Sequence, residues 1–420
     1  MVVPVRPRLL FVCRDFLFPT DEGGKIRSAN ILRQLKGGVF EVSLASPAPA
    51  DRARFSAEIE SACDHFLPWA VEPQKRDGRV GAIPGLALVQ SLYRAVAVPV
   101  ADAFRSVSGS AVVAGALASG PDVVVVDFPY PDVLMPRRMR PASVVFTHNV
   151  EAEIFERQAA VAAGFWRLVA LCQASRMERF ERDVLRRYDS VIAVSARDAV
   201  ALRQRYSLPV VEPISTGIDL DFFRYSAPSE APYLHPDGGT IVFTGLMNWS
   251  ANIDGIYFLM NDIWPLIARA RPRAKALIVG RNPQKSLLAA VAARELPWTV
   301  TGSVEDIRPY VASGHVSVIP LRVGSGTRIK AFEAMAMGRP VVSTRVGIEG
   351  LEMEDGRHFL AADTAPEFAA AALRLLDDAA LRESLARAAR ARLEECFSWT
   401  IVARQFEAIC LRTIARLDAD

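Results

Sequence analysis

Short runs of β-branched and other apolar residues alternate with longer helical patterns along most of the chain. Within these runs apolar residues follow one another directly, which is typical of strands covered on both faces and therefore of a parallel sheet. The first half has four such runs, at Leu9–Cys13, Asp122–Asp127, Ser143–His148 and Ser190–Ser195. The second half has five, at Thr240–Gly245, Lys275–Gly280, Trp298–Gly302, Val316–Pro320 and Pro340–Thr344. Two successive βα arrays predict an α/β protein with two doubly wound domains.

The break between the two arrays is predicted within residues 213–239, which are rich in Pro, Gly and Ser and lack a helical period. We therefore expect an N-terminal domain over residues 1–215 and a C-terminal domain over residues 216–396. The Arg- and Ala-rich residues 374–395 predict a solvated pair of helices. The last segment, 397–420, has an apolar residue about every 3.6 positions and predicts an amphipathic helix that packs back on the N-terminal domain. Its apolar positions are Trp399, Val402, Phe406, Ile409, Cys410 and Ile414.

Composition narrows the class of protein. The chain has 420 residues, of which 51% are hydrophobic, so each domain can form its own core. Its 50 basic and 47 acidic residues leave a formal net charge of +3, too small to suggest a nucleic-acid partner. Five scattered cysteines without a C-x-x-C pair indicate neither a disulfide framework nor a zinc ribbon and fit a reducing compartment. Because no apolar stretch reaches membrane-spanning length, we expect a cytoplasmic protein.

The segment Pro320–Gly350, PLRVGSGTRIKAFEAMAMGRPVVSTRVGIEG, contains the main candidate site. A predicted strand ends at Pro320, and the loop formed by Gly324, Ser325, Gly326 and Thr327 leads into a helix that begins near Arg328 and ends at Gly338. Helix N-termini beyond the carboxyl ends of parallel strands offer free N–H groups to anions, and Arg328 and Lys330 add two cations. Such a site can hold a diphosphate without a metal. The alternative is an ordinary βα turn with both cations in solvent.

Glu333 lies on the same predicted helix, five residues after Arg328. A carboxylate has two acceptor oxygens and can bind both hydroxyls of a ribose. The alternative is a surface glutamate without a ligand.

These residues carry a resemblance to a known family. The run GSGTRIKAFEAMAMGRPVVST, followed by GIEG, resembles the signature of the retaining glycosyltransferases of family 4, which have the GT-B fold. The segments Phe243–Asp254 and Ile214–Phe223 are similar to the family's first donor-domain loop and its domain-crossing segment. Asp21–Leu35 and Phe146–Arg157 are similar to its glycine loop and its histidine loop. The resemblance implies two facing Rossmann-like domains with the C-terminal helix returning to the first.

The resemblance also implies roles for individual residues. Glu333 matches the glutamate that binds the donor ribose, and Gly326 matches a loop glycine that faces the diphosphate. Gly245 belongs to the donor-side loop. Ser325 stands where the family usually has a second glutamate for the donor sugar, so the identity of that sugar stays open. The usual Arg and Lys of the first donor-domain loop are absent from GLMNWSAN, and Arg328 and Lys330 are expected to supply phosphate contacts in their place.

The first domain has two candidate segments. Gly23 and Gly24 follow the first predicted strand, where glycine lets a ligand approach the backbone closely, and Lys25 follows them. The resemblance places this loop on the acceptor side; the alternative is a flexible turn. His148 ends a predicted strand and is expected to face the cleft, and the resemblance implies a catalytic position near the donor sugar. The alternative is a structural hydrogen-bonding histidine.

Several features of the chain admit a structural explanation beside a functional one. Glu151 and Glu153 are weaker catalytic candidates. The other histidines show no metal-binding spacing, and Asp219-Leu220-Asp221 is better explained by turn chemistry than by a metal, so we expect no metal and no cofactor. The aromatic and Arg-rich segment Phe165–Arg187 could contact anionic lipid on the inner face of a membrane, or could be a solvated helix with Glu–Arg pairs.

Together these observations predict glycosyl transfer. The expected partners are a nucleotide sugar and a carbohydrate or lipid-linked acceptor. Two alternatives remain open on the same fold. One is a sugar-nucleotide epimerase, for which no acid/base carboxylate pair is evident. The other is a non-catalytic scaffold protein that binds sugar nucleotides, which the replacement at Ser325 makes conceivable.

Overall fold

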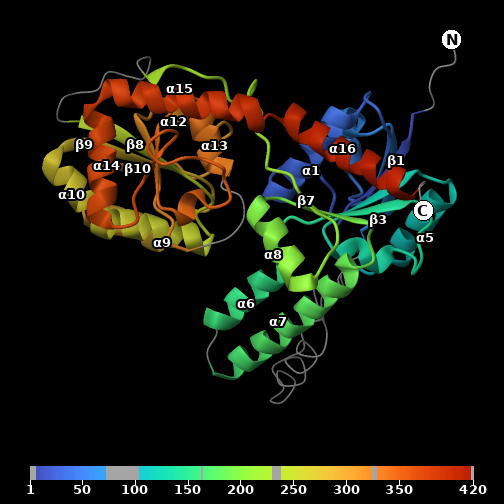
Figure 1. The fold of residues 1–420 in the computed structure, drawn as a ribbon. Coiled ribbons are helices and arrows are strands. Elements are labelled where there is room, and N and C mark those ends of the chain that lie inside the picture. Colours follow the sequence, from blue (N-terminus) through green and yellow to red (C-terminus); the bar gives the residue numbers. More distant parts are fainter. Residues whose placement is uncertain (1–5, 72–103, 162–163, 229–237, 324–328, 418–420) are drawn as a thin grey trace, which may run out of the picture. The chain divides into compact units, whose positions relative to one another are not determined.

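The computed structural model describes residues 6–71, 104–161, 164–228, 238–323 and 329–417 (Figure 1). The chain divides into two compact units. Unit 1 comprises Met1–Thr216 together with Trp399–Asp420, and unit 2 comprises Gly217–Ser398. A search of the described helices finds none long and apolar enough to cross a membrane.

Unit 1 is built on a seven-stranded parallel sheet with the order β3-β2-β1-β4-β5-β6-β7. The strands are β1 (Arg8–Val12), β2 (Glu41–Ala48), β3 (His65–Ala70), β4 (Val123–Asp127), β5 (Ala142–Phe146), β6 (Ser190–Ala193) and β7 (Val211–Pro213). All five residues of β4 are buried, as its unbroken apolar run predicted. The strands β2, β3 and β7 were not predicted.

Helices cover both faces of this sheet, so successive residues of a strand belong to different cores. Leu9 and Phe11 of β1 pack in one core, and Leu10 and Val12 pack in the other. The helical elements of unit 1 are α1 (Gly23–Leu35), η1 (Arg52–Phe55), α2 (Ser56–Ala62), α5 (Val107–Ala118), η2 (Tyr130–Leu134), α6 (Glu151–Val161), α7 (Gly164–Leu185), α8 (Ala196–Tyr206) and α16 (Trp399–Leu417). This two-sided covering is what a doubly wound domain requires.

The C-terminal helix α16 belongs to unit 1 and lies beside α1 (Figure 1). The ring of Phe406 on α16 is fully buried, with its centroid 6.2 Å from that of Phe11 and 5.6 Å from that of Phe146. The predicted return of this helix to the N-terminal domain is therefore correct, and its apolar stripe completes one of the two cores.

Unit 2 repeats the architecture with six parallel strands in the order β10-β9-β8-β11-β12-β13. They are β8 (Gly238–Thr244), β9 (Arg273–Val279), β10 (Trp298–Val300), β11 (Val316–Ile319), β12 (Val341–Ser343) and β13 (Leu360–Ala361). The helical elements are α9 (Ser250–Phe258), η4 (Leu259–Ile263), α10 (Trp264–Ala270), α11 (Lys285–Ala293), α12 (Arg308–Ala312), α13 (Ile329–Ala336), η5 (Val346–Ile348), α14 (Ala365–Asp377) and α15 (Ala379–Cys396). All five strands predicted in this half are present.

One prediction about unit 2 was wrong. The helices α14 and α15, expected to be a solvated pair, contribute buried side chains to its core, among them Leu375, Leu385 and Leu393. The many Arg and Ala residues of this segment concealed a leucine stripe, which packs inward beside the buried Arg382, while Arg374 and Arg387 remain at the surface.

Candidate functional site

In unit 1 the predicted glycine loop packs directly against an aromatic ring. Helix α1 begins at Gly23. A Cβ atom added to Gly24 would lie 2.9 Å from Cζ of Phe128 and 3.7 Å from Nδ1 of His148. A side chain at residue 24 would therefore have to displace the Phe128 ring, and this close approach brings the loop over His148.

His148 lies just beyond the end of β5, and both of its ring nitrogens bond to protein groups. Nε2 is 2.6 Å from Oδ1 of Asp127, and Nδ1 is 3.0 Å from a terminal nitrogen of Arg27. A carboxylate only accepts and a guanidinium only donates, so Nε2 carries the proton and Nδ1 accepts. Burial lowers the pKa of His148, although Asp127 opposes that shift, and the ring is held neutral.

Asp127, the last residue of β4, organises this cluster. Its carboxylate is buried and also accepts a 2.9 Å hydrogen bond from the hydroxyl of Ser28. Arg27 donates in addition to the hydroxyl of Thr216, and burial lowers its pKa to about 10. We call Arg27, Ser28, Asp127, His148 and Thr216 the buried polar cluster. Sequence reasoning missed the role of Asp127, whose only signal was a charged residue that ends a buried strand.

Phe128 forms the wall between the buried polar cluster and the glycine loop. It has a left-handed backbone, with φ of 69°, which is costly for a bulky residue and is found where the surrounding structure fixes it. Its ring stacks on His148 with a centroid distance of 4.0 Å and an interplanar angle of 15°. The guanidinium of Arg14 lies 4.2 Å from the centroid of the same ring.

A cavity of about 200 Å³ opens beside this wall. Its lining is mostly polar or charged and comes from the glycine loop and the ends of β1, β4 and β5: Arg14, Asp15, Leu17, Glu22, Gly23, Gly24, Lys25, Asp127, Phe128 and Asn149. The ammonium group of Lys25 lies 3.0 Å from the carboxylate of Asp21. The structure thus brings the three predicted loop residues, Gly23, Gly24 and Lys25, to one cavity. His148 lies beneath it with no free ring nitrogen, and its expected contact with a donor sugar stays a prediction.

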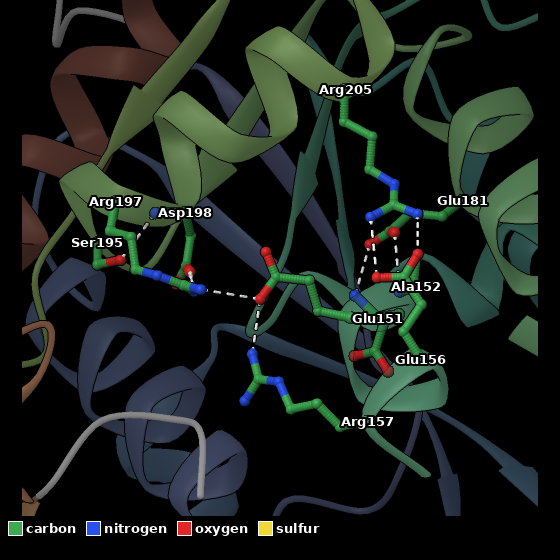
Figure 2. A network of polar contacts seen from close by, with 10 residues as sticks. Glu151, Ala152, Glu156, Arg157, Glu181, Ser195, Arg197, Asp198 and Arg205 are labelled. Atoms are coloured by element: carbon green, nitrogen blue, oxygen red, sulfur yellow. Dashed lines mark hydrogen bonds and ion pairs between the residues drawn. The ribbon is translucent and has the colours of Figure 1, made fainter. Parts of the chain in front are cut away.

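Glu151 and Glu153 have structural partners within unit 1. The carboxylate of Glu151 is buried and accepts a 2.6 Å hydrogen bond from the hydroxyl of Tyr130, and burial raises its pKa. Figure 2 shows the carboxylate of Glu181 accepting the backbone N–H groups at the start of α6, at 2.8 Å from Glu151 and 3.1 Å from Ala152. Glu153 pairs with two arginines at the surface. This network fixes α6 and needs no ligand.

Part of the predicted donor site lies outside the described residues. This applies to Gly324, Ser325, Gly326, Thr327 and Arg328. Their roles stay predictions, and unit 2 is described around them.

The described part of the predicted donor site joins three segments of unit 2. Lys330, in the first turn of α13, donates a 2.7 Å hydrogen bond from Nζ to Oδ1 of Asn252 on α9. Gly245 follows β8 at the same place, since a Cβ atom added there would lie 2.9 Å from Nζ of Lys330 and 2.7 Å from Nδ2 of Asn252. The buried ring of Phe243 lies beneath the ammonium group, 4.5 Å from Nζ to the ring centroid. Gly245 and Lys330 were predicted, whereas Asn252 was not.

Asn252 connects the loop after β8 to α13. Its side chain is buried, accepts from Lys330 and donates a 2.8 Å hydrogen bond to the carbonyl oxygen of Leu246. A buried amide that uses both ends in this way holds a flexible lysine in one place. Because β8 and β11 are neighbours, the lysine is held at the carboxyl edge of the sheet, where α/β proteins bind ligands.

Glu333 lies one turn after Lys330 on α13 and is half-buried. Burial raises the pKa of its carboxyl to about 7, with Lys330 opposing the shift. Among the described residues, no group donates a hydrogen bond to this carboxylate. A desolvated acceptor of this kind is suited to ligand hydroxyls, which would supply the missing donors.

Two observations on the described residues concern metal binding. Asp219 accepts hydrogen bonds from the backbone N–H groups of Asp221 and Phe222, at 3.1 and 2.8 Å, which is the turn chemistry expected for this segment. In the parts of the chain that the structure describes, no three His, Cys, Asp or Glu side chains gather in a way that could hold a metal ion.

Comparison with known proteins assigns a domain type to each half of the chain. Residues 26–222 match the family model described as Glycosyltransferase Family 4, and residues 238–378 match the one described as Glycosyl transferases group 1. Two relatives are the MMP alpha-(1->4)-mannosyltransferase of Mycolicibacterium hassiacum and an uncharacterized 44.6 kDa protein in the cps region of Klebsiella pneumoniae. The first is 34% identical over 33% of this chain, and the second 22% identical over 34% of it. The chain spans only 34% and 40% of the length of these two relatives.

Solved structures match over nearly the full chain. Sucrose-phosphate synthase from Thermosynechococcus elongatus aligns with a TM-score of 0.70 and 19% identity over 98% of this chain and 100% of the other. HepE from Anabaena, in complex with UDP-glucose, aligns with a TM-score of 0.63 and 15% identity over 98% and 100%. At these identities the likeness establishes the fold, which is the predicted GT-B fold. The chain thus has the GT-B fold, and its two halves are similar in sequence to glycosyltransferase domains, residues 26–222 to Glycosyltransferase Family 4 and residues 238–378 to Glycosyl transferases group 1.

Proposed function

We propose that the protein transfers a sugar from a nucleoside-diphosphate donor to a hydroxyl group of a carbohydrate or lipid-linked acceptor, with retention at the anomeric carbon. The observation that carries this proposal is the arrangement of Gly245, Asn252 and Lys330 at the carboxyl edge of the sheet, one turn from Glu333. A fixed cation next to a desolvated acceptor suits a ligand that has both a diphosphate and a ribose. The likeness to a mannosyltransferase and to HepE with UDP-glucose supports the same class of donor.

The donor is held by groups that act on its two ends. Lys330 contacts the diphosphate, assisted by the free N–H groups at the start of α13 and, in this proposal, by Arg328 and the loop Gly324–Thr327. Glu333 accepts the ribose hydroxyls, which supply the hydrogen bonds that its carboxylate lacks. Gly245 leaves room for the diphosphate beside Lys330, because any side chain there would occupy that space.

The chemical step depends on the departing nucleotide. The bond between the anomeric carbon and the diphosphate oxygen breaks, and the acceptor oxygen bonds to the same face of that carbon. The acceptor proton passes to an oxygen of the leaving diphosphate, so no side chain needs to act as a nucleophile. Lys330 and Arg328 stabilise the negative charge that grows on the diphosphate, which is the largest electrostatic change in the reaction.

Unit 1 supplies the acceptor side. The cavity beside Gly23, Gly24 and Lys25 receives the acceptor, and charged groups such as Arg14 and Asp15 line it. His148 contributes through position, because it supports Phe128 and, through that ring, the glycine loop. The pathway we propose is the assembly of a polysaccharide or glycoconjugate.

A panel of nucleotide sugars tests this function in two steps. Calorimetry identifies the donor that binds, and nucleotide release with and without added acceptors measures turnover. We expect one donor to bind, to hydrolyse slowly alone and to turn over faster with an acceptor. The variant Lys330→Ala should lose this turnover, whereas Lys285→Ala, which removes an exposed lysine from the start of α11, should keep it.

The outcomes separate the alternatives. Binding without release of the nucleotide, with any acceptor, would indicate a scaffold protein. A change of sugar configuration with the nucleotide still attached would indicate an epimerase. Absence of binding across the whole panel would overturn the donor site itself.

A further inference from the structure

The helices α6 and α7 pack against each other as a hairpin in unit 1, connected by residues 162–163 (Figure 1). Beyond its first two turns, α7 packs into unit 1, since it buries Ala174, Met177 and Val184 together with the polar Gln173 and Glu181. The start of α7 is different, because large apolar side chains are exposed there.

Four of these side chains lie within seven residues. The exposed fractions are 47% for Phe165, 58% for Trp166, 62% for Leu168 and 49% for Leu171. We call these four residues the apolar tip. Exposed apolar groups that cluster in this way mark a binding surface, whereas single exposed apolar residues are common on any protein.

The direction of these side chains narrows the choice of partner. Consecutive residues of a helix are separated by about 100° around its axis, so Leu171, Leu168 and Phe165 follow one another at steps of about 60°, and Trp166 lies about 100° beyond Phe165. The four side chains therefore spread over about 220° of the helix circumference, more than one face. A folded protein partner covers one face of a helix and would leave the others in water. A lipid interface is fluid and can surround the end of a helix on all sides.

The charge around the apolar tip favours an anionic surface. The chain has no Asp or Glu between Glu156 and Glu178, while Arg157, Arg167 and Arg176 lie in that interval. Arg167 is exposed within the apolar tip and makes no ion pair with any residue that the structure describes. Two copies of this chain would bring like charges together at such a contact, whereas anionic headgroups would neutralise them.

We propose that the apolar tip enters the interfacial region of a membrane that contains anionic lipids. Trp166 and Phe165 lie at the boundary between headgroups and acyl chains, Leu168 and Leu171 lie among the acyl chains, and Arg167 contacts lipid phosphates. This function is separate from sugar transfer, because none of these residues lines the glycine loop cavity of unit 1, and the predicted donor site belongs to unit 2. It would hold the enzyme at the surface where lipid-linked substrates occur.

Sedimentation of the full chain with vesicles tests the proposal. We expect binding to vesicles of phosphatidylcholine with phosphatidylglycerol, and much weaker binding to phosphatidylcholine alone. The triple variant Phe165→Ser/Trp166→Ser/Leu168→Ser should bind at least about tenfold more weakly. The matched control Val200→Ser/Leu288→Ser changes side chains that are 47% and 42% exposed on α8 and α11, and it should bind like the parent. Circular dichroism checks that both variants fold.

A second measurement locates the contact. Phosphatidylglycerol vesicles with brominated acyl chains should quench part of the tryptophan fluorescence of the parent. In Trp166→Phe, which keeps an apolar ring, the protein should still bind while most of this quenching disappears. In Arg167→Glu, binding should lose its preference for anionic vesicles.

Three results would overturn the proposal: equal vesicle binding by the parent and the triple variant, quenching that persists in Trp166→Phe, or self-association that the triple variant abolishes while no variant binds vesicles. Donor turnover without vesicles reports separately on the proposed transferase. The triple variant should keep that turnover, so failure of one proposal can be told from failure of the other.

Discussion

Nε2 of His148 lies 2.6 Å from Oδ1 of Asp127, and both side chains are almost completely buried. A carboxylate in such a place costs free energy unless donors surround it, and here His148 and Ser28 supply them. The hydrogen bond therefore stabilises the fold of unit 1 and, through the stacked ring of Phe128, the shape of the cavity beside the glycine loop.

The first prediction concerns Asp127. Asp127→Ala leaves the buried donors of His148 and Ser28 without an acceptor, so the free energy of unfolding of unit 1 should fall by about 1–3 kcal/mol. Asp127→Asn keeps one acceptor oxygen and should cost less. Urea denaturation measures both, with Asp183→Ala as the control, because that exposed residue pairs only at the surface and should change stability by less than about 0.5 kcal/mol. Equal stability of Asp127→Ala and the parent would show that the buried polar cluster is not stabilising.

A second prediction follows from the size of Gly24. Gly24→Ala places a methyl group within 2.9 Å of the Phe128 ring, so that ring and its stack on His148 must shift, and stability and turnover should both decrease. Gly115→Ala is the control, since no atom lies near its added Cβ on α5. It should raise the free energy of unfolding by about 0.5–1 kcal/mol, because alanine loses less backbone entropy in a helix. If Gly24→Ala behaved like the control, the close packing of the loop would be unnecessary.

A third prediction is a pH dependence that arises from Glu333. Its pKa is about 7 in the folded protein against an ordinary value of 4.5, so between these pH values the folded state holds a proton that the unfolded chain has released. Stability should therefore fall as pH rises through this window, by up to about 3 kcal/mol at about 1.4 kcal/mol per pH unit. Glu333→Gln removes this loss, so the variant should exceed the parent in melting temperature at pH 8 and approach it at pH 5.

The same substitution should have the opposite effect on binding. The amide has one acceptor oxygen where the ribose needs two, so Glu333→Gln should bind the nucleoside diphosphate more weakly by about 1–3 kcal/mol. Glu305→Gln, at an exposed position, should change neither stability nor affinity. If Glu333→Gln gained stability at pH 8 and kept its full affinity for the nucleoside diphosphate, the nucleotide would bind at another site.

The fourth prediction tests the role of Lys330 in the chemical step. Charge grows on the diphosphate as the glycosidic bond breaks, so the cation should stabilise the transition state more than the bound donor. Lys330→Ala should lower kcat by roughly 10²-fold, which corresponds to about 3 kcal/mol, with a smaller rise in KM. Arg328→Ala should act in the same direction. If only KM rose, these residues would bind the donor without stabilising the leaving group. If neither variant changed kcat or KM, the start of α13 would have no role in leaving-group stabilisation.

The fifth prediction concerns metals. The proposed site neutralises the diphosphate with fixed cations and helix N–H groups, so turnover should be the same with and without EDTA. Loss of turnover with EDTA and recovery with Mg²⁺ or Mn²⁺ would contradict the proposed site.

The features that were predicted have a local pattern in the sequence, whereas those that were missed have an interrupted pattern or depend on residues far apart in the chain. The buried runs of β4 and β8 were recognisable because strands covered on both faces are apolar throughout. Strand β2 was missed because Glu41 and Ser43 interrupt its apolar residues, and β3 because it contains Pro68. Gly245 and Lys330 were predicted separately, but their contact through Asn252 was not, since Lys330 and Asn252 are 78 residues apart and their spacing carries no signal. The ring nitrogens of His148 were likewise assigned only once Arg27 and Asp127 were located.

The placement of α16 has a consequence for biosynthesis. Unit 1 is assembled from two segments of the chain, and Phe406 of the second segment fills the core between Phe11 and Phe146 of the first. During translation, residues 6–216 leave the ribosome first, but their core stays open until the whole of unit 2 and α16 have been made. Unit 2 is continuous in sequence and can close its core earlier. A chain interrupted before residue 399 would therefore display an apolar groove lined by phenylalanine, so the quality-control machinery of the cell could distinguish an incomplete protein from a finished one by its exposed surface.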